Sequence, residues 1–290
     1  MKIYSLVIIF LLSASLAGAA DPIRVIIFGA HPDDCEYTSG GIAAMYSQMG
    51  HQVKFVSMTN GNKGHHAMTS AALGARRAEE AKDVARILGI KEYEIMDNDD
   101  GELTPSLANR FAVIKMICDW EADIVITHRP NDYHPDHRYA STLVQDAAYM
   151  ISVPHMIPTG DALRKPVVFL YMPDHFQKPN PFSPDIVIDV TSVFDKKLEA
   201  VCANVSQFFE WMPWNEGYEN EVPAEQAQKL KTVENRYMAW SKVDNYKKAA
   251  LNWYSSAQLK NTRYVEAFEI CEYSYIPNKN EIKKLFPMLP

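Results

Sequence analysis

Short apolar runs alternate with stretches of helical period along the first half of the chain. Runs with the composition of buried strands, several of them rich in valine and isoleucine, occupy residues 24–30, 52–59, 93–97 and 123–128. Between and after these runs, apolar residues recur every three to four positions, which predicts helices over 39–50, 76–89, 105–120 and 138–150. A strand followed by a helix at this spacing requires parallel crossover connections. The pattern therefore predicts an α/β fold with a mostly parallel, doubly wound, Rossmann-like sheet.

The second half of the chain is less regular. Strand-like runs are found at 167–173 and 185–190, and helical patterns at about 193–209 and 223–259. Residues 264–273 again have strand character, and we expect them to return to the sheet or its edge. No internal repeat or clear linker interrupts residues 21–290. We therefore expect a single domain with a C-terminal helical elaboration.

The first twenty residues have the pattern of a secretory signal. Lys2 precedes a short apolar stretch, and small residues follow it as far as Ala19 and Ala20. The alternative is an uncleaved membrane anchor, but the apolar stretch is short for a bilayer span. We therefore predict a signal peptide over residues 1–20, a secreted or periplasmic protein, and no integral membrane segment after cleavage.

Charge and cysteine content narrow the possible partners. The chain has 29 Lys and Arg against 36 Asp and Glu, and the predicted signal contains one base and no acid. An acidic mature protein is a poor binder of nucleic acid or of an anionic membrane surface. The four cysteines can pair as disulfides in an exported protein or lie buried as free thiols. No CxxC spacing occurs, so we do not expect cysteine to bind a metal.

Two clusters of histidine and carboxylate stand just after predicted strands. They occupy residues 30–36 and 131–137, and each contains the tripeptide His-Pro-Asp. In a parallel sheet the carboxyl ends of the strands lie at one edge, where open α/β sheets bind their ligands. Two segments that are distant in the sequence are thus expected to form one site.

The residue types in these clusters suit a catalytic zinc ion, which has three protein ligands and a water molecule. Asp33 and Asp34 are adjacent and cannot easily share one role. One of them can bind the metal, while the other takes a proton from the metal-bound water as it attacks a carbonyl. Of the two histidines in the second cluster, one can complete the metal shell. The other, oriented by Asp136, can face the substrate.

These motifs resemble those of a known family. Residues 30–36 followed by 39–41, and later residues 131–137, resemble the LmbE-like deacetylases. These include the N-acetylglucosaminyl-phosphatidylinositol de-N-acetylases (PIG-L) and the mycothiol-pathway deacetylases. Weaker similarities extend the resemblance over most of residues 24–270: Arg77, Glu79, Glu80, 88–89, 100–101, 206–207 and 266–268. The paired motifs are specific, whereas each of the later similarities is weak by itself.

The resemblance implies a role for individual residues of the site. The implied zinc ligands are His31, Asp34 and His137. The implied catalytic residues are Asp33 as general base, His134 as acid or as the group that polarises the carbonyl, and Asp136 as the partner of His134. Arg77 in the second helix, and Asp100 in the loop after the third strand, are the expected substrate contacts.

The implied function is that of a zinc-dependent hydrolase that removes the acetyl group from an N-acetylglucosaminyl-type sugar or glycoconjugate. Two alternatives stay open: a hydrolase of another amide or ester with the same metal site, and a metal-containing sugar-binding protein without turnover. A binding protein has no use for a carboxylate directed at the water, so Asp33 favours an enzyme. The first strand ends without a GxGxxG pattern, which argues against a nucleotide-binding oxidoreductase.

Two further groups of residues are weaker candidates. His65 and His66 follow the second predicted strand and can line the same sheet edge, although exposed loop histidines are common. The aromatic stretch 208–214 can offer a stacking face for a sugar ring, but large apolar side chains of this kind favour packing in the interior.

Overall fold

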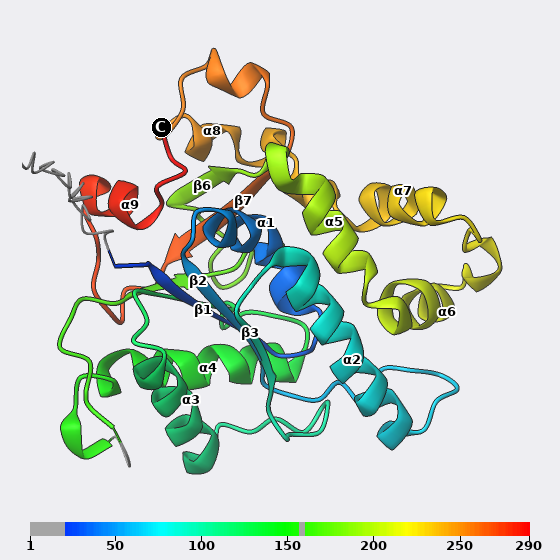
Figure 1. Cartoon of the computed structure of the whole chain (residues 1–290), viewed down its shortest axis with the longest axis horizontal. Coiled ribbons are helices and arrows are strands. Elements are labelled where there is room, and N and C mark those ends of the chain that lie inside the picture. Colours follow the sequence, from blue (N-terminus) through cyan, green and yellow to red (C-terminus); the bar gives the residue numbers. More distant parts are fainter. Residues whose placement is uncertain (1–20, 157–159) are drawn as a thin grey trace, which may run out of the picture.

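The structure is a computed structural model that describes residues 21–156 and 160–290 (Figure 1). The signal peptide predicted for residues 1–20 lies outside these residues, so it stays a prediction. In the part of the chain that the structure describes, no helix has the length and apolar character needed to span a membrane. All four cysteines lie in the described part, and each is buried as a free thiol rather than paired in a disulfide.

A seven-stranded sheet forms the centre of the molecule. Its strands are β1 (Arg24–Gly29), β2 (Gln52–Ser57), β3 (Glu92–Ile95), β4 (Ile124–Thr127), β5 (Val168–Tyr171), β6 (Ile186–Asp189) and β7 (Val265–Ile270). Their order in space is β3-β2-β1-β4-β5-β7-β6. The pairs from β3 to β5 are parallel, while β7 is antiparallel to both of its neighbours. The predicted α/β fold with a mostly parallel, doubly wound sheet is thus confirmed.

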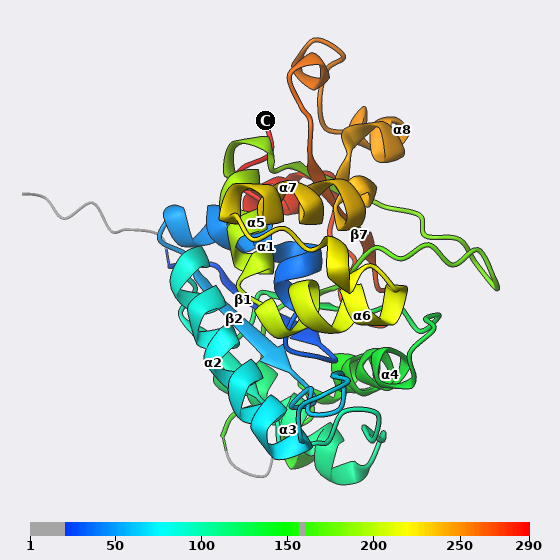
Figure 2. The ribbon, with the colours of Figure 1, turned by 90° about the vertical axis from the view of Figure 1, so that its right-hand side faces the viewer.

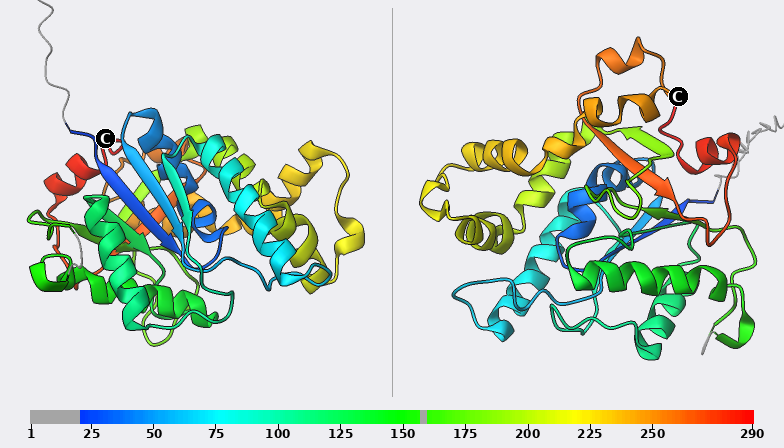
Figure 3. Two further views of the ribbon diagram at one scale, coloured as in Figure 1. Left: turned by 60° about the horizontal axis from the view of Figure 1, so that its bottom comes forward. Right: turned by 180° about the vertical axis from the view of Figure 1, so that it is seen from behind.

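Helices cover both faces of this sheet. They are α1 (Asp34–Gln48), α2 (Ser70–Leu88), α3 (Leu107–Asp119), α4 (Pro135–Met150), α5 (Phe194–Cys202), α6 (Met212–Glu216), α7 (Gln226–Tyr237), α8 (Lys247–Ala250) and α9 (Lys279–Leu285). Figures 1 and 3 show α3 and α4 on one face and α1, α2 and α5 on the other. Successive strand residues point to opposite faces. Accordingly, Val25 and Ile27 pack with the α1 side, and Ile26 and Phe28 with the α3 and α4 side.

Three helices begin earlier than the sequence pattern predicted: α2 begins at Ser70 instead of residue 76, and α1 and α4 begin inside the histidine motifs. Of these two, α1 starts at Asp34 instead of residue 39, and α4 starts at Pro135 instead of residue 138. Nδ1 of His134 caps α4 by accepting the backbone N–H of Asp136, and proline suits a first helical position. The apolar periodicity misses the first turns of α1 and α4 because their side chains face the site instead of the core.

The C-terminal half is more broken than predicted. The helix expected over 193–209 ends at Cys202, and a π-helical segment, η3 (Ser206–Trp211), follows it. The helix expected over 223–259 divides into α7, α8 and short 3₁₀ turns. Residues 265–270 return to the sheet as predicted and lie between β5 and β6. Figure 2 shows α6 and α7 on the side of α1, where the hydroxyl of Tyr37 donates to the Tyr237 carbonyl at 2.7 Å.

The sheet changes direction of winding between β1 and β4. The chain adds β2 and β3 on one side of β1, then crosses over to add β4 and β5 on the other side. A crevice forms at such a switch point, outside the carboxyl ends of the strands. The motif after β1 and the motif after β4 therefore start next to each other.

Candidate metal and catalytic site

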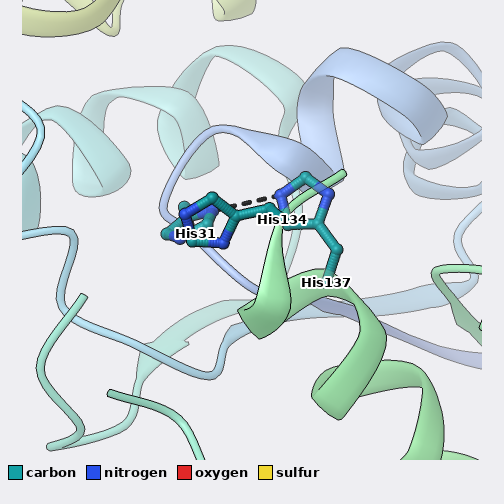
Figure 4. Close-up of side chains that lie close together, drawn as sticks. All are labelled: His31, His134 and His137. Atoms are coloured by element: carbon teal, nitrogen blue, oxygen red, sulfur yellow. Dashed lines mark hydrogen bonds between the residues drawn. The ribbon is translucent and has the colours of Figure 1, made fainter. Parts of the chain in front are cut away.

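Three side chains from the two motifs meet at this switch point. Nδ1 of His31 lies 3.2 Å from Nε2 of His137, as the dashed line in Figure 4 shows. The carboxylate of Asp34 completes the group: its oxygens lie 3.6 Å from Nδ1 of His31 and 3.5 Å from Nε2 of His137. The structure thus brings together the three residues expected to bind zinc.

Local backbone geometry holds Asp34 in this position. It is the first residue of α1, and its Oδ2 accepts the backbone N–H groups of Ala30 at 2.9 Å and His31 at 2.8 Å. The helix can approach the end of β1 this closely because residue 29 is glycine. A Cβ atom at Gly29 would lie 2.7 Å from the Cβ of Asp34. Burial would raise the pKa of Asp34, but His137 and His128 hold it well below its usual range.

Carboxylates orient the outer nitrogen of His31. Its Nε2 lies 3.1 Å from Asp100 and 3.3 Å from Asp136. Burial would lower the pKa of His31, but these two carboxylates and Asp34 raise it well above its usual value. A proton on Nε2 leaves the lone pair on Nδ1, the nitrogen that faces His137.

The same arrangement is found at His137, from α4. Its Nδ1 lies 3.1 Å from Asp132, so that its other nitrogen, Nε2, faces His31 and Asp34. The ring of His128 stacks on that of His137, with centroids 4.1 Å apart. Nε2 of His128 accepts the backbone N–H of Ala30 at 3.2 Å.

The donor set fits a divalent metal such as zinc. Two imidazole lone pairs and a carboxylate oxygen lie close together, and such groups are stable in contact only when a cation or a proton lies between them. Tetrahedral zinc with bonds of about 2.0–2.1 Å places its ligand atoms roughly 3.3–3.4 Å apart, close to the observed separations of 3.2 to 3.6 Å. Metal-binding histidines typically have their second ring nitrogen against a carboxylate, as Nε2 of His31 and Nδ1 of His137 do here at 3.1 Å. Among the described residues, four compact groups overlap with this set, among them His31, His134 and His137, and also Asp34, His128 and His137.

Asp33 stands beside this group and has a different partner. Its Oδ2 lies 3.0 Å from a guanidinium nitrogen of Arg77, whose side chain is only 2% exposed. A second nitrogen of Arg77 donates to Oε1 of Gln207 at 3.0 Å. Gly61 makes room for this arginine: its φ is +63°, and a Cβ there would lie 2.8 Å from Nε of Arg77. Asp33 is thus a fixed carboxylate next to the candidate metal ligands.

His134 has a defined tautomer. Burial, together with the neighbouring His31 and His137, lowers the pKa of His134, so the ring is neutral near pH 7. The backbone N–H of Asp136 donates to Nδ1 of His134 at 3.2 Å. The ring proton therefore lies on Nε2, which is available as a donor. The expected contact between His134 and Asp136 is long: Oδ2 of Asp136 lies 4.0 Å from Nδ1 of His134. The same oxygen lies closer to His31, at 3.3 Å from its Nε2.

The structure places the two expected substrate contacts in the cleft and against other side chains of the site. Arg77 lines the cleft, but its guanidinium is buried against Asp33 and Gln207. Asp100 also lines the cleft, and its carboxylate contacts His31. Burial would raise the pKa of Asp100, but His31 and Arg77 lower it to about 2. Both residues thus contact side chains of the site, and their expected binding of substrate stays a prediction.

Sequence reasoning gave no role to three residues that the structure places in the site. These are His128, Asp132 and Gln207. Asp132 lies inside the second motif, and His128 directly follows β4, so their positions at a strand end were a usable signal. Gln207 comes from the π-helical segment η3, far along the chain, where the sequence offered only the weak family similarity at residues 206–207.

A second charged cluster connects η3 with α2. Glu210 accepts from both terminal nitrogens of Arg76 at 2.7 Å and lies 2.9 Å from Nε2 of His65. The rings of His65, His66, Trp214 and Trp211 form a stacked series, with centroid distances of 4.7, 4.9 and 5.4 Å. The aromatic stretch is thus packed partly against the two loop histidines, while Trp211 also lines the cleft.

Comparisons with known proteins agree with this site. Residues 26–148 match the family described as PIG-L, GlcNAc-PI de-N-acetylase. The diacetylchitobiose deacetylase of Thermococcus kodakarensis is 31% identical over 203 residues, which are 66% of this chain and 73% of that protein. The 4-oxalmesaconate hydratase of Pseudomonas putida is 27% identical over 194 residues, which are 64% of this chain and 74% of that protein.

A solved structure supports the fold independently. That of N,N'-diacetylchitobiose deacetylase from Pyrococcus horikoshii superposes with a TM-score of 0.65 at 23% identity and covers 90% of this chain and 89% of its own. At this identity the likeness shows the fold. Together with the sequence matches, which include both histidine motifs, it leads to one conclusion: the chain belongs to the PIG-L (LmbE-like) family of de-N-acetylases.

Proposed function

We propose that this protein is a zinc-dependent hydrolase that removes the acetyl group from an N-acetylated sugar. The observation that carries the proposal is the convergence of His31, Asp34 and His137, with the separate carboxylate of Asp33 beside them. The similarity to a diacetylchitobiose deacetylase supports the choice of substrate class. We assign the zinc to these three residues, which lie deep in the crevice and have their lone pairs directed at one another.

Each neighbouring residue has a task in this reaction. Asp33 accepts a proton from the attacking water, and its ion pair with Arg77 holds the carboxylate in place. Nε2–H of His134 donates a hydrogen bond to the carbonyl oxygen, where negative charge develops. Bound zinc supplies a Lewis acid that polarises the carbonyl and lowers the pKa of water. Asp100, Asp132 and Asp136 keep the histidine rings oriented.

The balance of the reaction is simple. The water oxygen bonds to the acetyl carbon, and the bond between that carbon and the sugar nitrogen breaks. Asp33 takes one proton of the water and passes it to the sugar nitrogen, so the amine leaves with an added proton. The products are acetate and an amino sugar.

Apart from the proposed zinc, the side chains of the site offer little that would hold a carboxylate substrate. The carboxylates of Asp33, Asp34, Asp100, Asp132 and Asp136 surround the three histidines. Arg77 is already paired with Asp33, and Lys63, the other cation lining this cleft, is paired with Glu102. An anion such as the substrate named for the related hydratase would find no unpaired cation among these residues.

Amine release tests the proposal. Zinc-loaded protein is incubated with N-acetylglucosamine and N,N'-diacetylchitobiose, and the free amine and acetate are measured. We expect both products in equal amounts, and a loss of at least about 100-fold in Asp33→Asn, the size of a general-base contribution. Equal release by wild type and Asp33→Asn would contradict the mechanism. Saturable sugar binding without release would favour the binding-protein alternative.

We propose further that the protein acts outside the cytoplasm, on the strength of the signal pattern in residues 1–20. The substrate is then an extracytoplasmic N-acetylated glycan. N-terminal sequencing of the protein recovered from outside the cytoplasm should begin at Asp21, whereas a start at Met1 would contradict the export proposal.

A further inference from the structure

The cleft at the switch point has two lobes that meet at the reaction centre. The polar lobe, about 460 Å³, extends past His134 toward Lys63, Trp211 and Asn215. The second lobe, about 290 Å³, extends past His128 toward Pro173 and Phe176. The residues shared by both lobes are Asp33, Asp34, Tyr133, His137 and Gln207. The general base and two candidate metal ligands therefore stand where the lobes join.

The second lobe has an apolar lining away from the reaction centre. Tyr37 from α1, Phe176, and Phe208 and Met212 at a spacing of four residues form much of its wall. Phe208 is buried and stacks on Tyr37, with centroids 6.2 Å apart.

Thr38, Asp174 and His175 are the polar residues of this lining beyond the centre, and the Thr38 hydroxyl donates to the Asp34 carbonyl at 2.8 Å. Asp174 is neutralised by Arg129, whose guanidinium donates to both carboxylate oxygens at 2.9 and 3.0 Å. His175 is exposed, so it lies at the solvent side of this wall. An apolar group in the lobe would therefore meet the faces of Phe208, Met212 and Phe176 without an unpaired carboxylate.

The segment η3 explains why the two lobes differ. It is π-helical, a geometry that is rare and often found at functional sites. Trp211 lines the polar lobe, while Phe208 and, just after the segment, Met212 line the second lobe. Gln207 reaches the junction, where Arg77 holds it. One short segment thus separates a polar side of the reaction centre from an apolar side.

An amide also has two sides, an amine side and an acyl side. On the basis of the proposed function, we propose that the second lobe binds the acyl part of the amide, and that the preferred substrates are amino sugars with N-acyl chains longer than acetyl. A methyl group has about the size of a water molecule, roughly 30 Å³. The lobe of about 290 Å³ exceeds that need severalfold.

The reaction keeps the same balance with a longer chain. The oxygen of water bonds to the acyl carbon, the bond from that carbon to the sugar nitrogen breaks, and the amine leaves with a proton. The products are a short fatty acid and an amino sugar, so no further reactant is required. Burial of each additional methylene can contribute up to about fourfold in transition-state binding.

The test compares N-acetyl-, N-butanoyl- and N-hexanoylglucosamine as substrates of the zinc-loaded protein. We expect kcat/KM to rise with chain length, by at least about tenfold from acetyl to hexanoyl. A larger side chain in the lobe, Met212→Trp, should lower this hexanoyl-to-acetyl ratio toward one. The matched control is Tyr149→Ala, an exposed position on α4, which should keep the wild-type ratio. An equal or lower kcat/KM for hexanoyl than for acetyl in wild type would overturn the proposal, as would an unchanged ratio in Met212→Trp.

A binding measurement separates this proposal from the proposed function. Calorimetric titration of zinc-free protein with the same three compounds needs no turnover. Tighter binding of the hexanoyl compound by wild type, and loss of this preference in Met212→Trp, would support the acyl lobe even if no compound is hydrolysed. The absence of hydrolysis would then contradict the proposed function and leave the acyl lobe supported. If all three compounds are hydrolysed at the same rate and bound with the same affinity, the proposed hydrolase function is supported. The proposal that the second lobe binds the acyl chain is then overturned.

Discussion

The guanidinium of Arg77 lies 3.0 Å from the carboxylate of Asp33, and the pair is almost fully withdrawn from solvent. Burial would lower the pKa of Arg77, but the charge of Asp33 raises it above its usual value. The arginine therefore stays charged beside Asp33. Its position lets it hold the carboxylate in place, while the substrate contact expected from the sequence stays a prediction.

This pairing predicts a specific pattern in a double-mutant cycle. Arg77→Met leaves Asp33 buried without its cation and should lower the free energy of unfolding by about 3–5 kcal/mol. Asp33→Asn in that background removes the unpaired charge and should restore part of this stability, without restoring amine release. Urea unfolding and kcat/KM of the three variants check both statements. A double variant as unstable as Arg77→Met would show that the pair is not coupled.

Metal analysis distinguishes the proposed ligand group from the group that contains His128. We expect His31→Ala and His137→Ala to hold far less than one zinc per chain, because each removes one of three ligands. His128→Asn should keep its zinc, since Nε2 of His128 already accepts the Ala30 N–H. Full occupancy in His31→Ala together with loss in His128→Asn would assign the metal to the group that contains His128.

Asp132 offers a test of the orienting carboxylates. It lies 3.1 Å from Nδ1 of His137, so Asp132→Asn should lower zinc affinity about 10–100-fold while all three proposed ligands remain. Competition with a chelator of known affinity measures the effect. Asp99→Asn, in the exposed loop beyond β3, is the matched control and should bind zinc like wild type. Equal affinity in both variants would remove Asp132 from the support of the site.

Periodicity predicted most of the sheet because its strands are buried on both faces and its helices have one apolar face. All seven predicted strands are present, including β7, the late return to the sheet. The same signal misplaced the starts of α1 and α4, because Asp34 and His137 face a polar crevice there. It also missed the π-helical segment at 206–211, which lies at the end of the stretch that was expected to form one helix.

The two motifs predicted the centre of the site for a topological reason, since both follow parallel strands at the switch point. The sequence could not predict which carboxylate contacts which histidine ring. Asp136 precedes His137 in the sequence, yet its carboxylate contacts His31 from the other motif. Such pairings depend on side-chain directions across the crevice, and adjacency in sequence does not encode them.

The pH dependence of stability should include a contribution from Glu210. The hydrogen bonds from Arg76 lower the pKa of Glu210, and the hydrogen bond from Nε2 of His65 lowers it further. A lowered folded-state pKa contributes stability that is present above the unfolded value of about 4.3 and is lost as the pH falls through the folded value. Because Glu210 is partly exposed, the contribution should stay below about 1 kcal/mol.

Thermal unfolding of wild type and Glu210→Gln between pH 3 and pH 7 tests this sign. We expect wild type to be the more stable of the two at the upper end and the difference to vanish at the acid end. Glu79→Gln, at an exposed position of α2, should show no such convergence. A difference that grows as the pH falls would reverse the inferred direction of the shift.

The pair of Lys197 and Glu266 predicts the largest stability effect outside the site. Both side chains are fully buried, and Nζ of Lys197 lies 2.5 Å from Oε1 of Glu266. The same carboxylate accepts the backbone N–H groups of Gly41 and Ile42 at 2.7 Å, so it ties β7 and α5 to the helix that begins at Asp34. Burial lowers the pKa of Lys197, although Glu266 opposes this shift.

Lys197→Met should therefore destabilise the protein by about 3–5 kcal/mol, because it leaves Glu266 buried without its cation. Adding Glu266→Gln removes that charge and should recover part of the loss, since the amide can still accept from a backbone N–H. Lys82→Met breaks an exposed ion pair with Glu79, both side chains being 71% exposed, and should change stability by less than about 1 kcal/mol. Urea denaturation of the zinc-loaded variants compares them, and equal effects of Lys197→Met and Lys82→Met would contradict a buried, charged link between β7 and α1.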